Sequence, residues 1–117
     1  MEVNLENNGL TLEEYQMLAA RTAGAGGRGE RRLMLSALGL AGEAGEYANL
    51  VKKFTAHGHA VNTHALADEL GDILWYVAEA ATSCGLNLGE IANQNVAKLT
   101  ERYPEGFDEE RSRNRTS

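Results

Sequence analysis

Cysteine and proline are almost missing from this sequence of 117 residues, in which each occurs once, as Cys84 and Pro104. A single cysteine cannot form a disulfide within the chain, which indicates a reducing compartment. We therefore expect a cytoplasmic protein. Cys84 lies near a predicted helix end, where we expect it to be a small buried side chain.

Basic residues are fewer than acidic ones. The chain has 11 of the former and 17 of the latter, which gives a net charge of -6. Non-specific binding to polymeric nucleic acid needs clustered basic residues that displace phosphate counterions, so we expect no such partner. The charge does not exclude one phosphorylated small molecule. No apolar run approaches the length of a membrane span, and the start of the chain lacks a basic-then-apolar signal pattern, so we expect no membrane partner.

Strand signals are nearly absent, because β-branched residues are sparse and do not alternate with polar ones. Helical segments are predicted over about 12–23, 30–56, 64–84 and 88–103. Two of them begin with capping boxes, Thr11 with Glu14 and Asn87 with Glu90. Gly85 follows the third segment, at a position where a left-handed residue ends a helix.

Four helices with short connections predict an all-α fold, a four-helix bundle-like single domain over residues 1–107. The remaining segment, 108–117, is polar and charged, so we expect a disordered tail. Trp75 lies away from the apolar stripe of its helix, which indicates a second buried surface. We therefore expect a homodimer or homotetramer, in which a second subunit completes the bundle and helps to close a ligand pocket.

Two of the predicted helices carry acid pairs three residues apart, on equivalent edges of their apolar stripes. Glu43 and Glu46 lie beside the stripe of the segment 30–56, and Glu69 and Asp72 take the same place in the next helix. If the stripes pack antiparallel, four carboxylates converge, and their repulsion raises their pKa values unless a divalent cation neutralises them. Oxygen ligands of this kind suit Mg²⁺ or Mn²⁺.

Glycines beside the acids strengthen the metal interpretation. Each interior glycine costs a helix roughly 1 kcal/mol relative to alanine, and Gly42, Gly45 and Gly71 all adjoin the acids. We interpret Gly45 and Gly71 as positions that keep the space between the two helices open. The segments "LAGEAGEYANL" from Leu40 and "LADELGDILWY" from Leu66 form a weak internal repeat, which two amphipathic helices also show by chance.

The acid pairs resemble the signature of the MazG-like nucleoside triphosphate pyrophosphohydrolases, an all-α family. That signature is E-x-x-E on one helix and E-x-x-D on the next, which the chain matches with "EAGE" at 43–46 and "ELGD" at 69–72. "EYQMLAART" near the start and "NVAKLTERYPEGF" near the end are also similar, so the resemblance covers about residues 12–107. Many members carry another acid before the first signature glutamate, where this chain has Gly42, so no role is carried over for that acid.

The resemblance implies hydrolysis of an NTP or dNTP between the α and β phosphates, which gives a nucleoside monophosphate and pyrophosphate. It also implies a role in clearing unwanted nucleotides from the pool. The cofactor would be Mg²⁺, with Mn²⁺ as an alternative, and its ligands would be Glu43, Glu46, Glu69 and Asp72. The sequence does not separate a ligand from a general base among four acids, and we choose Glu46 as the base.

Polar residues outside the acid pairs are candidates for contacts with the nucleotide substrate. They are Gln16, Lys53, Tyr76, Asn95, Lys98 and Arg102. On the last helix, Lys98 and Arg102 would hold phosphate oxygens, while Asn95 would hydrogen-bond a sugar or base. Each candidate also has a structural alternative, such as a solvated basic flank for the last helix or core packing for Tyr76.

Two other functions compete with the enzyme interpretation. A di-iron carboxylate bundle uses Glu-x-x-His pairs, but no histidine lies on either acidic face. A non-catalytic helical oligomerisation or interaction module with an acidic, metal-binding edge would tolerate alanine in place of Glu43 or Asp72. The three histidines, His57, His59 and His64, crowd one connection, and we expect them to be flexible-loop residues rather than zinc ligands.

Overall fold

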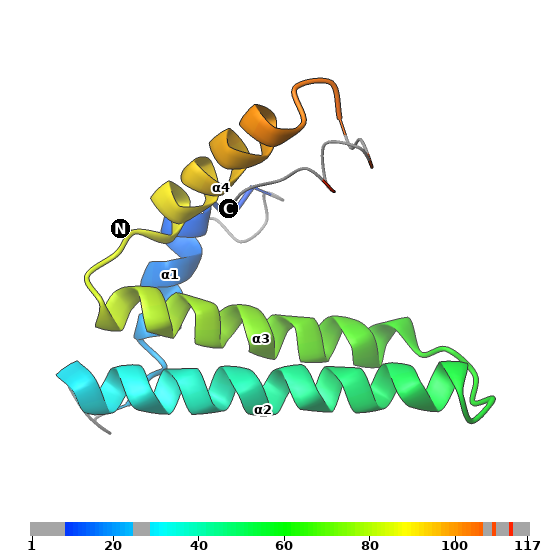
Figure 1. The fold of residues 1–117 in the computed structure, drawn as a ribbon. Coiled ribbons are helices and arrows are strands. Elements are labelled where there is room, and N and C mark those ends of the chain that lie inside the picture. Colours follow the sequence, from blue (N-terminus) through cyan, green and yellow to red (C-terminus); the bar gives the residue numbers. More distant parts are fainter. Residues whose placement is uncertain (1–8, 25–28, 107–108, 110–112, 114–117) are drawn as a thin grey trace.

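The structure is a computed structural model that describes residues 9–24, 29–106, 109 and 113. These residues form four α-helices and no strand, which confirms the all-α prediction. The helices are α1 (Leu12–Ala20), α2 (Gly29–Thr55), α3 (Thr63–Ser83) and α4 (Leu88–Arg102) (Figure 1). The predicted disordered tail, 108–117, lies outside the described residues except for two positions.

Short polar side chains fix three of the helix starts. At α1, the Thr11 hydroxyl accepts from the Glu14 amide at 3.0 Å, and the Thr11 amide donates to the Glu14 carboxylate at 2.9 Å, so the predicted capping box is confirmed. Asn62 and Asn87 each accept at 3.0 Å from the backbone amide three residues on. Gly85, with φ of 71°, takes the expected left-handed conformation after α3.

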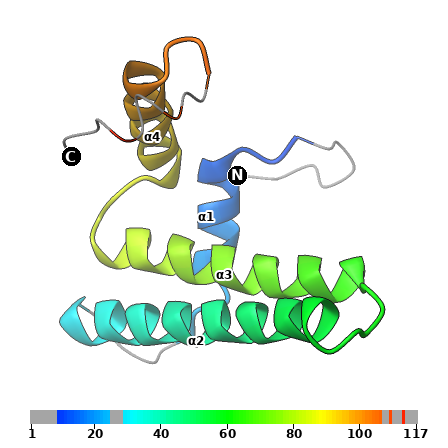
Figure 2. The same cartoon turned by 45° about the vertical axis from the view of Figure 1, so that its right-hand side comes forward.

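The helices α2 and α3 form a long antiparallel pair, and the other two helices lie on one side of it (Figures 1 and 2). Helix α1 packs across α3, and α4 packs on α1. From there α4 leads away from the α2–α3 pair (Figure 1). The signature acids therefore lie on a different pair of helices from the candidate substrate residues of α4.

The core is small and is built largely from small side chains. Its buried residues are Ala19, Ala78 and Leu88, with Tyr15, Trp75, Val77 and Ile91 packed against them. None of the large side chains in the described part is fully buried, and Leu38 and Val96 are 64% and 60% exposed. No described helix is both long and apolar enough to cross a membrane.

Trp75 does lie on a second packed surface of α3, but the chain covers that surface itself. Its indole Nε1 donates to the Thr22 hydroxyl at 2.8 Å, just beyond the end of α1, and its ring packs against the core. Trp75 therefore gives no argument for a second subunit. The homodimer or homotetramer stays a prediction.

An ion pair that we did not predict ties α2 to α3. Arg32 donates from Nε and Nη2 to the two carboxylate oxygens of Glu79, at 3.1 and 2.9 Å. The Glu79 side chain is only 7% exposed, so its charge depends on this two-pronged partner. The pair raises the pKa of the Arg32 guanidinium, chiefly through its hydrogen bonds to Glu79.

The glycine that the α2–α3 contact requires is Gly39, which the sequence did not single out. A Cβ at Gly39 would collide with the ring of Tyr76 on α3. By contrast, a Cβ at Gly42, Gly45 or Gly71 would meet no atom within 4 Å. Our interpretation of Gly45 and Gly71 as spacers between the helices is therefore wrong for this chain, because both face open space.

We expect Gly39→Ala to lower the free energy of unfolding by about 1–3 kcal/mol, because the Tyr76 ring must leave its position against α2. The matched variant Gly45→Ala should instead raise it by up to about 1 kcal/mol, because alanine favours a helix and meets nothing there. Urea unfolding of both variants in chelator measures the difference. Equal effects of the two substitutions would show that Tyr76 does not pack against Gly39.

Candidate metal centre

Antiparallel packing of α2 and α3 brings three of the four signature acids together. One carboxylate oxygen from each of Glu43, Glu69 and Asp72 lies within 4.8 Å of the other two. Glu43 and Glu69 are half-buried between the helices, and Asp72 is exposed. Among the described residues, this acidic trio is the one group of histidine, cysteine or acidic side chains spaced to hold an ion.

Glu69 carries the strongest sign of a missing positive charge. Its Oε2 is shielded from solvent and has no hydrogen-bond partner. Its pKa is raised, first because its charged form is desolvated, next because of the adjacent Glu43 carboxyl, and then because of the charges of Glu46 and Asp72. A divalent cation with a preference for oxygen ligands would relieve both problems, so the residues present fit Mg²⁺ or Mn²⁺.

Glu46 does not join the acidic trio, although we predicted it as the fourth ligand. Glu46 is rotated by about 60° from Glu43 around α2. The same rotation separates Asp72 from Glu69 on α3, but there both carboxylates reach the trio, whereas that of Glu46 does not. Its charge still contributes to the raised pKa of Glu69, which places it at the rim of the centre.

Tyr15 of α1 is a residue near the centre that we did not predict. Its pKa is raised by burial and, to a smaller extent, by the charge of Asp72. Asp72 is thus within electrostatic reach of α1. Its signal in the sequence is its place directly before Gln16 in the "EYQ" segment.

The structure gives Gln16 a structural role. Its amide nitrogen donates to the Thr82 hydroxyl at 3.1 Å and to the Leu86 carbonyl at 2.9 Å, and its oxygen accepts from the Leu88 amide at 2.8 Å. These three bonds tie α1 to the connection between α3 and α4. Both amide donors are used within the chain, so a contact of Gln16 with a base, which stays a prediction, would need one of these bonds to break.

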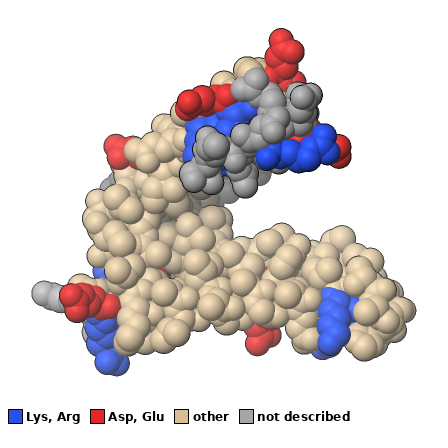
Figure 3. Space-filling view, in the orientation of Figure 1, with Lys and Arg blue, Asp and Glu red and all other residues tan. Residues whose placement is uncertain are grey.

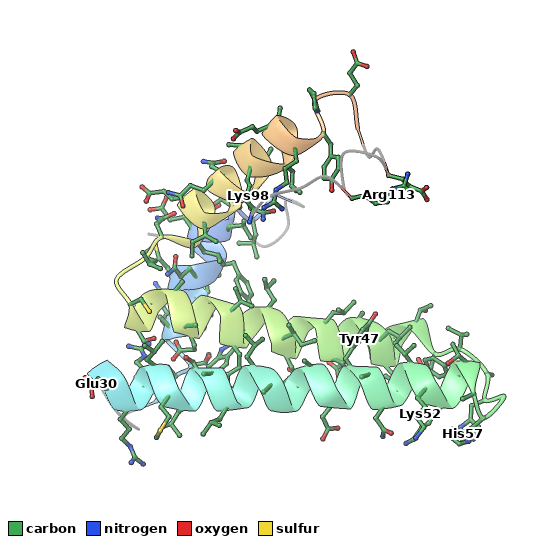
Figure 4. The ribbon with its side chains drawn as sticks, viewed as in Figure 1. Glu30, Tyr47, Lys52, His57, Lys98 and Arg113 are labelled. Atoms are coloured by element: carbon green, nitrogen blue, oxygen red, sulfur yellow. The ribbon has the colours of Figure 1, made fainter. Side chains whose placement is uncertain are left out.

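The candidate residues of α4 are not brought to the acidic trio within one chain. Asn95 and Lys98 are exposed and Arg102 is half-buried, on a helix that packs on α1. Figure 3 shows a wide notch between α4 and the α2–α3 pair, with basic side chains gathered on the α4 part. Lys98 projects from α4 on that side of the notch (Figure 4).

Two other candidates lie on the α2–α3 pair itself. Lys53 is exposed in the last turn of α2, where a positive charge also favours the helix dipole. Tyr76 is half-buried on α3, one turn beyond Asp72, where its ring packs against Gly39. Of these two, only Tyr76 is positioned between the helices that carry the trio.

The loop histidines and the cysteine form no centre of their own. His57 and His59 are exposed, with ring centroids 6.5 Å apart, and His64 is exposed at the start of α3. Cys84 is exposed, so our expectation of a buried thiol is wrong. It caps the C-terminal end of α3, at the surface of the molecule.

Comparison with known proteins identifies the family. Residues 33–107 match the family described as the MazG nucleotide pyrophosphohydrolase domain. The chain is also 38% identical over 100 residues to the "Gene 37 protein" of Mycobacterium phage L5, which covers 79% of this chain and 88% of that protein. No solved structure matches the chain. The family match spans more than half of the chain and contains all four signature acids, and the chain therefore belongs to the MazG nucleotide pyrophosphohydrolase family.

Proposed function

We propose that the protein hydrolyses a nucleoside triphosphate, NTP or dNTP, between its α and β phosphates in a Mg²⁺-dependent reaction. The products are a nucleoside monophosphate and pyrophosphate, and the role is clearance of unwanted nucleotides. The observation that carries the proposal is the acidic trio with the shielded, unpaired Oε2 of Glu69, in a chain of this family. Without a cation the carboxylates of such a centre repel one another, and a divalent cation would neutralise them.

The roles of the acids follow from their positions. Glu43, Glu69 and Asp72 would hold the cation, which supplies charge neutralisation for the triphosphate when bound. Glu46 is exposed at the rim and outside the trio, so its carboxylate is free to accept a proton from the attacking water. A carboxylate that binds the metal through its lone pairs is a poor base, so the base is best supplied by an acid outside the trio.

Phosphate contacts are proposed for Lys53, Lys98 and Arg102, and a sugar or base contact for Asn95. Because α4 leads away from the trio, we propose that its residues act on the nucleotide bound by a second copy of the chain, in a homodimer or homotetramer. Large exposed apolar side chains such as Leu38 and Val96 support such an assembly. The same surface would also serve a non-catalytic interaction module, which the following assay distinguishes.

We expect a panel of NTPs and dNTPs to give monophosphate and pyrophosphate with Mg²⁺ and nothing with chelator, resolved by chromatography. Asp72→Asn should lower kcat/KM by more than about 100-fold, because loss of residues that merely orient metal ligands already costs 10–100-fold. Asp68→Asn is the matched control. It removes an exposed acid of the same helix that lies outside the trio, and it should leave kcat/KM within about twofold.

Diphosphate and orthophosphate as products would show that another bond is cut. Equal activity of the Asp72→Asn and Asp68→Asn variants would show that the trio does not take part. Absence of turnover with every nucleotide, with both Mg²⁺ and Mn²⁺, would favour the interaction module.

The raised pKa of Glu69 predicts a pH-dependent response to metal. Its pKa lies above the ordinary 4.5 in the folded state, so the stability that its proton supplies is complete below pH 4.5 and is lost as pH rises through the raised value. Without metal, Glu69→Gln should therefore raise Tm at about pH 8 more than at about pH 5. With Mg²⁺, the wild type should gain Tm most at the higher pH, and the variant should lose that gain.

Thermal unfolding at both pH values, with Mg²⁺ and with chelator, measures these shifts. Asp68→Asn is again the control, and it should follow the wild type. A Mg²⁺ effect on Tm that persists in Glu69→Gln would contradict the assignment of Glu69 as a ligand.

A further inference from the structure

A second feature of the α2–α3 pair is a cavity of about 300 Å³ near the start of α2. It is distinct from the acidic trio, none of whose members line it. Its walls come from the connection that follows α1, from α2 and from α3. They are formed mainly by Ala23, Arg32, Leu35, Ser36, Trp75, Tyr76 and Glu79. Two aromatic rings and a charged pair in one cavity are typical of a ligand site rather than a packing defect.

Arg32 and Glu79 in this cavity have hydrogen-bond donors and acceptors that their ion pair does not use. Among the described residues, Arg32 donates from Nε and Nη2 to Glu79 alone, which leaves both N–H groups of Nη1 and the second N–H of Nη2 as donors. Each Glu79 oxygen accepts one of these bonds and retains another lone pair. The pair therefore offers a fixed donor beside a fixed acceptor, which is the complement of a nucleobase edge.

The aromatic walls of the cavity are held in place. The Trp75 indole is fixed by its bond to Thr22, and its ring meets Tyr76 edge to face, with centroids 4.9 Å apart and planes at 87°. The Tyr76 ring is fixed in turn against Gly39. A planar heterocycle of any identity can stack on aromatic rings that are already fixed in position.

The cavity lies along the same helix seam as the acidic trio. On α3, Glu79 is seven residues beyond Asp72, about 10 Å at 1.5 Å per residue, and Tyr76 lies between them. On α2, Ser36 is seven residues before Glu43, which gives the same spacing. This separation is comparable with the distance between the base and the phosphates of one nucleotide.

We propose that this cavity binds the nucleobase of the substrate, with Trp75 and Tyr76 against the ring and Arg32 and Glu79 along the base edge. The proposal rests on the proposed function for the identity of the ligand, because the trio would hold the phosphates of the same molecule. It assigns base selection to a residue pair that lies outside the signature acids. A base that left the buried Glu79 carboxylate without its second hydrogen bond would bind less tightly.

The test uses Trp75, the only tryptophan in the chain, as the probe. The full-length protein is titrated in chelator with nucleosides, which carry a base but no phosphate, and with inorganic triphosphate as a ligand without a base. We expect a saturable fluorescence change with at least one nucleoside and none with triphosphate. The nucleoside that binds most tightly should belong to the triphosphate with the lowest KM.

The variant Arg32→Lys keeps a cation beside Glu79 but removes the Nη1 donors. It should raise the nucleoside Kd and the triphosphate KM by about tenfold or more, with kcat within about twofold. Arg31→Lys, at an exposed neighbour that does not line the cavity, is the matched control and should change neither. Ala23→Phe fills the cavity and leaves both residues of the ion pair unsubstituted, and it should raise both constants even if Arg32→Lys folds poorly.

The outcomes separate the two proposals. If the protein hydrolyses triphosphates but Trp75 responds to no nucleoside, or Arg32→Lys behaves like Arg31→Lys, the base subsite is overturned and the hydrolase stands. If nucleosides bind and both cavity variants weaken them, but no triphosphate is hydrolysed, the cavity is supported and the proposed function fails.

Discussion

The ring of Tyr76 rests against the backbone of Gly39, and this contact sets the approach of α2 to α3. The acidic trio and the cavity both lie on the seam that the contact creates. One turn of α3 before Tyr76, the acidic trio gathers between the helices. One turn after it, Arg32 and Glu79 join the helices again and line a cavity. A wider separation of the two helices would disperse the trio and break the ion pair.

The two ends of this seam differ in whether a buried carboxylate has a positively charged partner. Glu79 is buried but balanced by a guanidinium, so it ties the helices together. Glu69 is shielded and surrounded by other acids, so its pKa is raised and the chain alone leaves it unbalanced. The paired charge of Glu79 thus stabilises the fold, whereas the unpaired charge of Glu69 destabilises it. An unbalanced, shielded charge of this kind is more typical of a functional site than of a structural contact.

Spacing along the sequence predicted the four helices, two of their caps and three of the clustered acids, because these depend on local geometry. It does not determine rotation about a helix axis or long-range packing. Glu46 follows Glu43 with the same spacing as Asp72 follows Glu69, yet its carboxylate lies outside the trio, and its role as a ligand stays a prediction. The spacer glycines were misassigned, since the pattern does not say which glycine faces the partner helix. The direction of α4, and hence the place of Lys98, depends on core contacts with α1 that no local pattern encodes.

We propose that the α2–α3 pair holds a divalent cation among Glu43, Glu69 and Asp72. A crystal structure of the protein grown with Mn²⁺ and a non-hydrolysable triphosphate analogue tests this through anomalous difference density for manganese. We expect a peak within coordination distance of all three carboxylates, with the analogue's phosphates beside it. A peak at another site, or an ordered analogue whose phosphates lie away from the trio, would contradict it.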